Sequence, residues 1–304
     1  MPHRRAVSAL RPLCLLAFVL VLGLAWAHHP LRAQDRPGAA RVPIRLYVFD
    51  GGRLESDPAR YQMTAQQVGG VTQLSVAAYL VVHPNGVLLW DAGAVPDEIW
   101  TPTGSPVRQH LVLPDGQERD VTITQRLGAQ LASAGYSPGQ VTHLALSHYH
   151  WDHTANANAF AQAIWLVQEP ERDAMFGGTA AGTSNAVTYA ALRTSRTVIV
   201  REDEHDVFGD GTVILKRAAG HTPGHQVLYL KLPETGGVVL SGDLYHYPQE
   251  RTLGTLPTFE VDAGATRMAR AALETFLART NARLWIQHDF TAHAALRKAP
   301  EFYQ

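Results

Sequence analysis

The chain has 304 residues, of which 46% are hydrophobic and 17% are charged, so it can bury a core of the size that one globular domain requires. Its formal net charge is −1, and no run of like charges stands out along it. This balance disfavours nucleic acid and anionic membranes as partners, and it favours a small neutral substrate.

Residues 1–27 are predicted to be a signal peptide. Arg4, Arg5 and Arg11 precede an apolar run from Leu13 to Ala27, which ends in Ala25-Trp26-Ala27, the small-x-small pattern that signal peptidase accepts. An uncleaved anchor is the alternative, but about fifteen apolar residues are short for a bilayer span. The Sec route fits better than the twin-arginine route, because the residues after the arginine pair match the twin-arginine pattern poorly.

Cleavage at this point changes the charge, the redox chemistry and the expected location. The mature chain keeps 23 Lys and Arg against 27 Asp and Glu, a net charge of −4, and it loses Cys14, its only cysteine. A chain without a thiol forms no disulfide, which suits an oxidising compartment. We therefore expect a periplasmic or secreted protein with a flexible N-terminus at residues 28–41 and one domain over residues 42–304, which has no membrane contact after cleavage.

Strand-like and helix-like segments then follow one another along the chain. Three apolar runs are typical of strands, namely Ile44–Phe49, Leu74–Val82 and Val87–Trp90. Three segments have helical periodicity, namely Gln125–Ala134, Glu169–Phe176 and Ala265–Ala278. Val141–Leu146 is predicted to be a buried strand, and Thr154 is expected near the start of a following helix. These segments fit an α/β sandwich of two mixed sheets covered by helices on both sides.

Two long connections carry no clear periodicity. They span Val95–Val121 and Leu244–Ala263, and both contain aromatic and aliphatic residues. Long loops inside a compact domain are usually functional or disordered. We expect these two to form the walls of a substrate cleft, with plain surface connections as the alternative.

The segment Ser147–His153 concentrates three imidazoles and one carboxylate. His148 and His150 alternate along the loop, so both side chains can point the same way, while Asp152 and His153 can turn toward a second centre. Neutral imidazoles and carboxylates bind zinc, and also iron, manganese or cobalt. The segment therefore predicts half of a two-metal hydrolytic site, against the alternative of a surface patch of histidines.

The remaining ligands are predicted at three other strand ends. His221, Asp243 and His288 each follow a strand-like run. Together with the first segment they give seven candidate metal ligands: His148, His150, Asp152, His153, His221, Asp243 and His288. This set provides three protein ligands for each of two divalent metals plus a shared carboxylate, and it leaves an open position for water, as a catalytic site requires.

With these residues the chain resembles the metallo-β-lactamase-fold hydrolases, whose H-x-H-x-D-H motif is matched at His148–His153. It is most similar to the N-acyl homoserine lactonases, through the run His221–Gln226, and the resemblance extends from about Val42 to Asp289. It implies a four-layer αββα sandwich, with Trp90–Gly93 as structural support.

The resemblance also assigns the ligands to two metals. It implies one metal on His148, His150 and His221 and a second on Asp152, His153 and His288, with Asp243 bridging them. His225 is interpreted as a hydrogen-bonding residue that orients its loop rather than as a ligand. His83 and His110 have no partner at ligand spacing and are expected to be exposed.

One position departs from the lactonase pattern. The family commonly has a tyrosine three residues after the bridging aspartate, and this chain has His246 there, between Tyr245 and Tyr247. Either the loop shifts to present a tyrosine, or His246 polarises and protonates the substrate, or the substrate differs; each aromatic could equally pack the loop. We expect Tyr245 and His246 to share the catalytic role with Asp152 and Asp243.

Related activities are separated by single residues. The flavin-linked diiron oxidoreductases have a glutamate at the position of His150, true β-lactamases usually lack the carboxylate of Asp243, and the tRNA-processing nucleases need a basic surface that is not visible here. A mononuclear iron dioxygenase is not excluded by the motif.

The sequence therefore predicts a dinuclear metal hydrolase that opens a lactone or related ester with a metal-bridging hydroxide. Zinc is the expected metal and a small neutral molecule with an apolar tail the expected substrate. A β-lactam or organophosphate hydrolase and a non-catalytic metal-binding or sensor protein are the alternatives, and a homodimer remains open.

Overall fold

A computed structural model describes residues 43–100, 106–114, 116–180 and 183–304 of the chain. The predicted signal peptide and residues 28–41 lie outside these ranges, and so does the first residue of the predicted domain. Within the described residues, no helix combines the length and the apolar composition that a membrane crossing needs.

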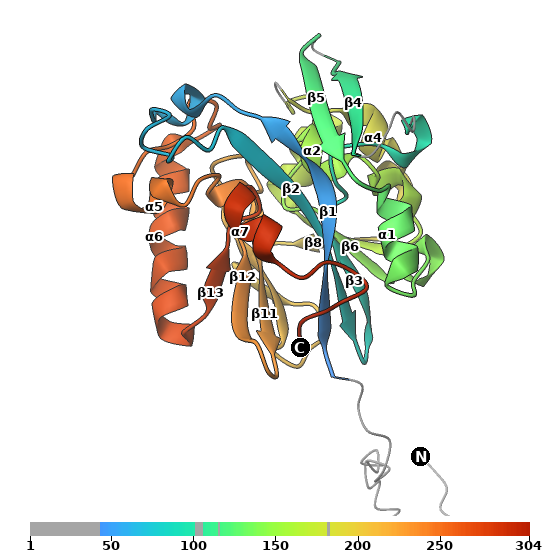
Figure 1. The fold of residues 1–304 in the computed structure, drawn as a ribbon. Coiled ribbons are helices and arrows are strands. Elements are labelled where there is room, and N and C mark those ends of the chain that lie inside the picture. The colour runs from blue at the N-terminus through green and yellow to red at the C-terminus, as the bar shows by residue number, and fades with distance from the viewer. Residues whose placement is uncertain (1–42, 101–105, 115, 181–182) are drawn as a thin grey trace, which may run out of the picture. The chain divides into compact units, whose positions relative to one another are not determined.

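Two mixed sheets form the centre of the described chain (Figure 1). The large sheet has the strand order β4-β5-β1-β2-β3-β6-β7-β8 and the small sheet has the order β13-β12-β11-β10-β9. The strands are β1 Arg45–Glu55, β2 Gln73–His83, β3 Gly86–Trp90, β4 Val107–Val112, β5 Glu118–Ile123, β6 His143–Ala145, β7 Ile164–Gln168, β8 Thr197–Val200, β9 Glu204–Asp206, β10 Val213–Arg217, β11 Gln226–Leu232, β12 Gly236–Leu240 and β13 Arg283–Trp285.

Helices occupy the connections between these strands. The α-helices are α1 Leu127–Ser133, α2 Trp151–Thr154, α3 Glu169–Gly177, α4 Ala186–Tyr189, α5 Gln249–Leu253, α6 Ala263–Thr280 and α7 Phe290–Ala295. Short 3-10 helices include Pro58–Tyr61, Ala157–Phe160 and Gly242–Leu244. In the large sheet β3, β6, β7 and β8 run parallel, so the loops after β6 and β7 leave the same edge of the sheet.

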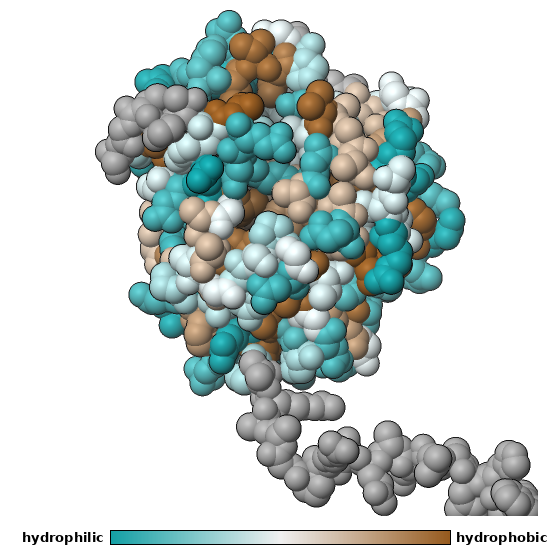
Figure 2. All heavy atoms as spheres, turned by 90° about the vertical axis from the view of Figure 1, so that its right-hand side faces the viewer, coloured by the Kyte–Doolittle hydropathy of each residue, from teal (hydrophilic) through white to brown (hydrophobic). Residues whose placement is uncertain are grey.

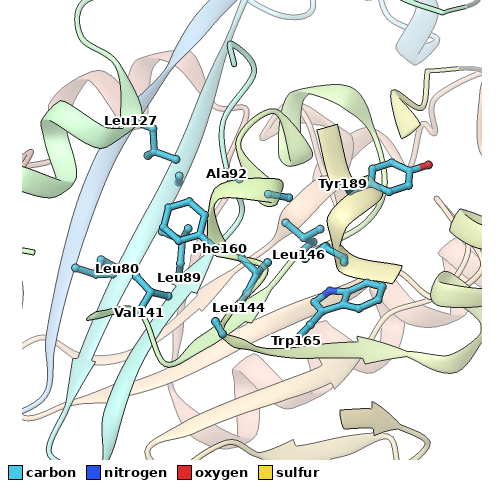
Figure 3. Close-up of a cluster of buried hydrophobic side chains, with 14 of the residues drawn as sticks. Leu80, Leu89, Ala92, Leu127, Val141, Leu144, Leu146, Phe160, Trp165 and Tyr189 are labelled. Carbon is cyan, nitrogen blue, oxygen red and sulfur yellow. The ribbon is translucent and has the colours of Figure 1, made fainter. Parts of the chain in front are cut away.

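Apolar residues on both faces of each sheet create four layers. Leu80 of β2 packs with α1 residues on the outer face of the large sheet (Figure 3), while its neighbour Val81 packs against Leu228 of the small sheet. The small sheet in turn buries Tyr229 against Phe276 of α6. The period-2 alternation of strand side chains thus feeds two different cores. This confirms the predicted αββα sandwich.

The outer surface on the α1 side is mixed in character. In Figure 2 hydrophilic and hydrophobic side chains are interspersed on this face, with several hydrophobic patches toward the top, the end at which β4 and β5 lie in Figure 1. Val112 of β4 is 65% exposed and Ile99 is 53% exposed.

Three expectations about local structure were wrong. Thr154 is the last residue of α2, which begins three residues earlier at Trp151 with His150 at its N-cap, so the helix starts inside the metal motif. The connection Val95–Val121 contains β4 and part of β5, which pair with each other and extend the large sheet. Leu244–Ala263 includes the short helix α5.

His83 is a further correction. It is 6% exposed, its ring stacks on Phe208 with centroids 4.3 Å apart, and its Nε2 lies 2.9 Å from Asp210 Oδ2. His110 is exposed as expected, and its Nδ1 lies 3.0 Å from Asp120 Oδ1. The partners of His83 lie in the distant connection between β9 and β10, and Asp120 lies in β5, a strand that was not predicted, so no local pattern reveals either contact.

Candidate metal centre

The H-x-H-x-D-H motif lies in the loop after β6. The loop is fixed at its start because the Ser147 amide donates to Asp91 Oδ1 at 2.6 Å. His148 and His150 precede α2, with His150 in extended backbone at its N-cap, and the first turn of α2 then carries Asp152 and His153 in a different direction. The change from extended loop to helix separates the motif into two pairs of side chains.

The small sheet contributes one residue from each of three strand ends. His221 lies between β10 and β11, Asp243 lies in the 3-10 helix after β12, and His288 follows β13. Because β12 and β13 are parallel neighbours, Asp243 and His288 leave the same edge of the small sheet. That edge faces the loop after β6.

The structure brings His148, His150, His221 and Asp243 into a first cluster. His148 Nε2 lies 2.8 Å from His150 Nδ1, and His150 Nδ1 lies 3.0 Å from His221 Nε2. His221 Nε2 is 3.3 Å from Asp243 Oδ2. These ligand atoms belong to one group in which every pair is within 4.8 Å.

Asp152, His153 and His288 form a second cluster on the other side of Asp243. The Nε2 atoms of His153 and His288 each lie 2.9 Å from Asp243 Oδ1, and His288 Nε2 lies 3.9 Å from Asp152 Oδ2. Asp243 therefore directs one carboxylate oxygen to each cluster. This is the geometry expected of a bridging carboxylate.

The chemistry of the two clusters fits divalent cations. All seven side chains are buried or nearly so. His153 Nε2 and Asp243 Oδ1 are close to each other and buried, but neither atom forms a hydrogen bond. Burial lowers the pKa of His148 and of His150 well below the usual value, so both rings are neutral. Neutral ring nitrogens that face one another across about 3 Å in a dry site are satisfied by a shared cation.

Asp243 carries the negative charge at the centre. Burial alone acts to raise its pKa, but the charges that His288 and His153 can carry lower the pKa of Asp243 well below its usual value. The carboxylate is therefore ionised and available to both clusters.

Outer contacts fix the orientation of the histidine rings. His153 Nδ1 lies 2.9 Å from Asp91 Oδ2, His221 Nδ1 lies 2.9 Å from Glu260 Oε1, and His288 Nδ1 donates to the Ser75 carbonyl oxygen at 2.7 Å. Such contacts hold the opposite ring nitrogen toward a metal and raise its basicity. The support expected from the Trp90–Gly93 turn thus comes through the Asp91 carboxylate.

His225 lies beside the first cluster and belongs to none of the groups of described side chains that could hold a metal ion. Its Nε2 accepts from the Asp243 amide at 2.9 Å, and its Nδ1 donates to the Ala218 carbonyl oxygen at 3.1 Å. A Cβ on Gly242, whose φ is +50°, would approach His225 Nε2 to 2.6 Å and Ser147 Cβ to 2.7 Å. The close approach of these loops thus requires glycine before Asp243.

The structure separates the two residues expected to replace the family tyrosine. His246 Nε2 lies 3.1 Å from Asp243 Oδ2, and its ring stacks on that of His288. The Tyr245 hydroxyl instead donates to Glu274 Oε1 at 3.1 Å, and its ring packs with the core beneath α6. Consecutive side chains in extended backbone point to opposite sides, so only His246 reaches the clusters.

Other residues around the site had no signal in the sequence. Tyr61, from the 3-10 helix after β1, lies with its ring centroid 4.8 Å from that of His246. Glu171 of α3 is buried beneath the first cluster, where burial raises the pKa of its carboxyl to about 7. Glu260 holds His221 from the loop before α6. Each comes from a segment distant in sequence, so spacing alone could not identify it.

A cavity of about 50 Å³ opens above the clusters. Its lining includes the cluster residues His150, Asp152, Asp243 and His288, and also Arg60, Tyr61, Arg119, Trp151, His246 and Phe259. Trp151 also lines a neighbouring cavity of about 110 Å³ beneath β4, with Ile99, Leu111 and Leu113. Each of the two long connections therefore lines a cavity at or next to the clusters: Val95–Val121 does so at Leu111, and Leu244–Ala263 does so at Phe259.

Residues 71–288 match the model of the metallo-beta-lactamase superfamily, so the chain belongs to that superfamily. Among curated relatives, the N-acyl homoserine lactonase AttM of Azorhizobium caulinodans is 28% identical over 86% of this chain and 98% of the relative. The N-acyl homoserine lactonase AiiA of Bacillus thuringiensis subsp. kurstaki is 25% identical over 85% of this chain and 98% of its own length.

Solved structures share the fold. An AiiA variant of B. thuringiensis with N-decanoyl-L-homoserine at its active site superposes with a TM-score of 0.69 at 22% identity, covering 85% of this chain and 98% of that one. The dizinc quorum-quenching lactonase AidC, in complex with a product, has a TM-score of 0.61 at 16% identity over 86% of this chain and 94% of that one.

Proposed function

We propose that the protein is a dinuclear metal-dependent lactonase that opens N-acyl homoserine lactones or closely related esters. One observation carries the proposal: the two oxygens of Asp243 face two separate clusters of buried ligands beneath an open cavity. The relatives named as N-acyl homoserine lactonases, matched over nearly their whole length, support the substrate class.

The side chains of the two clusters would hold two divalent ions, which would supply an activated water as nucleophile and a Lewis acid for the ester carbonyl. Asp243 sets the separation of the two centres, and Asp152 completes the second one. His246 Nε2 lies against Asp243 Oδ2 at the cavity wall, where it can hold a proton between that carboxylate and the leaving oxygen. Tyr61 and Phe259 close the cavity beside it and exclude bulk water.

The metal proposed for both clusters is zinc. Five imidazoles and two carboxylates form a ligand set of borderline softness that zinc favours, with iron, manganese and cobalt as alternatives. Purified protein reconstituted with zinc should hold two ions per chain. Elemental analysis checks this number. A plateau at one ion per chain with full activity would instead favour an enzyme with a single metal, such as the mononuclear iron dioxygenase.

The substrate proposed is small and neutral, with an apolar tail. Trp151 separates the cavity above the clusters from the apolar cavity beneath β4, so a chain that passes this ring can bury methylenes against Leu111 and Leu113. Each buried methylene is worth about 0.8 kcal/mol, so kcat/KM should rise with acyl length until the groove is full.

A substrate panel tests the activity. Metal-loaded protein should open acyl lactones faster than it hydrolyses β-lactams, aryl esters or phosphotriesters. A preference for a β-lactam or a phosphotriester would replace the lactonase proposal with that activity, and full metal binding without turnover of any class would favour a metal-binding or sensor protein.

We also propose that the protein is exported and matures by cleavage after Ala27. The support is the basic start, the apolar run and the small-x-small end of residues 1–27. Fractionation of expressing cells followed by N-terminal sequencing should find a periplasmic or secreted chain that begins at His28. An intact N-terminus in the membrane fraction would instead indicate an anchor.

A further inference from the structure

Glu171 is a buried carboxylate that lies outside both clusters and contacts the two loops that supply the first one. It is the third residue of α3 and is 2% exposed. The strand before it, β7, is the parallel neighbour of β6, so α3 begins next to the loop that carries His148 and His150.

The carboxylate accepts hydrogen bonds from both loops. Its Oε1 accepts from the Tyr149 amide at 2.8 Å, and Tyr149 lies between His148 and His150. Its Oε2 accepts from the Gly224 amide at 2.8 Å, and both oxygens are in reach of the Thr222 hydroxyl, at 2.8 and 3.0 Å. Thr222 directly follows His221. One side chain therefore joins the backbone beside all three histidines of the first cluster.

The loops lie as close to α3 as the backbone permits. A Cβ on Gly224 would approach the Glu171 amide nitrogen to 2.5 Å. At their base the loops are already joined by Gln226, whose amide donates to the Ser147 carbonyl oxygen at 3.0 Å. Glu171 adds a second, outer attachment that leaves little freedom to the separation of His150 and His221.

The second cluster is held by different groups. His153 Nδ1 contacts the Asp91 carboxylate, and His288 Nδ1 donates to the Ser75 carbonyl oxygen. Neither contact involves α3, and Asp152 belongs to α2. A disturbance at Glu171 therefore reaches the first cluster directly. It reaches the second cluster indirectly, through Asp243, through the Ser147 hydroxyl and through the backbone bond from His153 to His150.

We propose that Glu171 is a positioning residue that sets the metal affinity of the first cluster without setting that of the second. The inference rests on the proposed function, because it requires two metals per chain. The two oxygens of Glu171 together accept from three donors, which a glutamine side chain could not do, because the nitrogen of its amide only donates.

Glu171→Gln tests the proposal at constant side-chain volume. The amide places an NH₂ group against at least one of the donors from Tyr149, Thr222 and Gly224, so the loops must separate. The affinity of the first cluster for its metal should fall about 10- to 100-fold, as when other groups that orient metal ligands are removed. The affinity of the second cluster should stay within about twofold of the parent, because Asp91 and the Ser75 carbonyl, not Glu171, orient its histidines.

Cobalt-loaded protein distinguishes the two centres by absorption. Reference spectra come from His221→Ala, which damages the first cluster, and His288→Ala, which damages the second. Glu171→Gln at limiting cobalt should lose the component that His221→Ala loses and keep the component that His288→Ala loses. Glu169→Gln is the matched control: it lies two residues earlier on α3, pairs with Arg201 at the surface, and should keep both components.

Loss of both components together, or retention of both at parental affinity, would overturn the proposal. Thr222→Val is a second variant for the case that Glu171→Gln does not fold, because it keeps the side-chain shape and removes one of the donors to Glu171. It should weaken the first component alone, by a smaller factor, and equal weakening of both would count against the inference. A parent protein that holds fewer than two metals would overturn the proposed function itself, before any variant is compared.

Discussion

The two halves of the molecule supply the candidate site in opposite ways. The large-sheet half provides four ligands from one loop of six residues, His148 to His153, whereas the small-sheet half provides His221, Asp243 and His288 from three separate strand ends. A single loop can be arranged by its own backbone, but three loops converge only when the small sheet has formed and packed. The site therefore depends on local sequence on one side and on assembled tertiary structure on the other.

Asp243, from the small-sheet half, is the residue whose replacement should have the largest effect, because it serves both clusters. Asp243→Ala removes a ligand from both clusters, so we expect loss of both metals and a fall in kcat/KM of at least about 10³-fold, as for other groups on which the chemistry depends. Asp152→Ala, in the large half, should cost one metal. Metal content after dialysis at fixed free zinc measures both, and equal stoichiometry in the two variants would contradict the bridging role.

Variants of His246 and Tyr245 distinguish a catalytic role in the small-sheet half from a packing role. His246→Phe should lower kcat about 10- to 100-fold with little change in KM, because a proton held at Nε2 is needed chiefly in the transition state. Tyr245→Phe loses only a hydrogen bond to Glu274, so its kcat should stay within about twofold and its stability should fall by about 1 kcal/mol. Steady-state kinetics with an acyl lactone series decides between them, and a larger kcat effect in Tyr245→Phe would reverse the assignment.

Arg60 tests what the large half contributes to substrate choice. Its guanidinium lies 4.7 Å above the Phe259 ring, which in turn lies 5.8 Å from the rings of His221 and His246. Since a guanidinium donates readily to a carbonyl oxygen, Arg60→Met should reduce the preference for N-acyl lactones over alkyl lactones of equal length by about tenfold. Arg267→Met, on the exposed side of α6, is the control. An unchanged preference would show that Arg60 does not contact the acyl amide.

The last expected effect is on stability rather than on activity, and it concerns His293 of α7, a helix that follows the small sheet but packs against β2 of the large one. Burial lowers the pKa of His293 to about 3, so the folded state keeps the ring neutral while the unfolded chain binds a proton below pH 6.5. Stability from this group is therefore present above pH 6.5 and is lost as pH falls toward 3, at up to about 1.4 kcal/mol per pH unit.

His293→Phe should flatten this dependence. The difference in unfolding free energy between pH 7 and pH 5 should shrink by about 1–2 kcal/mol relative to the parent. Denaturant titrations of chelator-treated protein remove the contribution of metal release at low pH. If the variant and the parent lose equal stability, the acid sensitivity arises elsewhere.

The strands and the motif loop were predictable because their signals are local: apolar runs indicated β1 to β3, and the H-x-H-x-D-H spacing indicated the loop after β6. The four-layer fold and the grouping of the ligands into two clusters followed instead from the resemblance to the metallo-β-lactamase-fold hydrolases. The support around the site was not predictable. Glu260 contacts His221, and Glu171 contacts the backbone beside the histidines, each from another segment of the chain, and His83 contacts Asp210, 127 residues away. The sequence also did not show that His246, and not Tyr245, reaches the clusters. That difference depends on the extended backbone at Tyr245, which residue spacing does not determine.

The glycine before Asp243 has a consequence for engineering. A single methyl group at Gly242 would meet both His225 and Ser147. The contact of Gly242 with these two residues, which we call the seam between the halves, therefore tolerates almost no increase in side-chain size. At the rim of the cavity, by contrast, Leu54 and Phe259 are half-buried and Arg60 is exposed. Libraries that aim to change substrate preference should therefore diversify the rim and keep the seam constant, since substitutions at the seam would sacrifice folded protein before they altered selectivity.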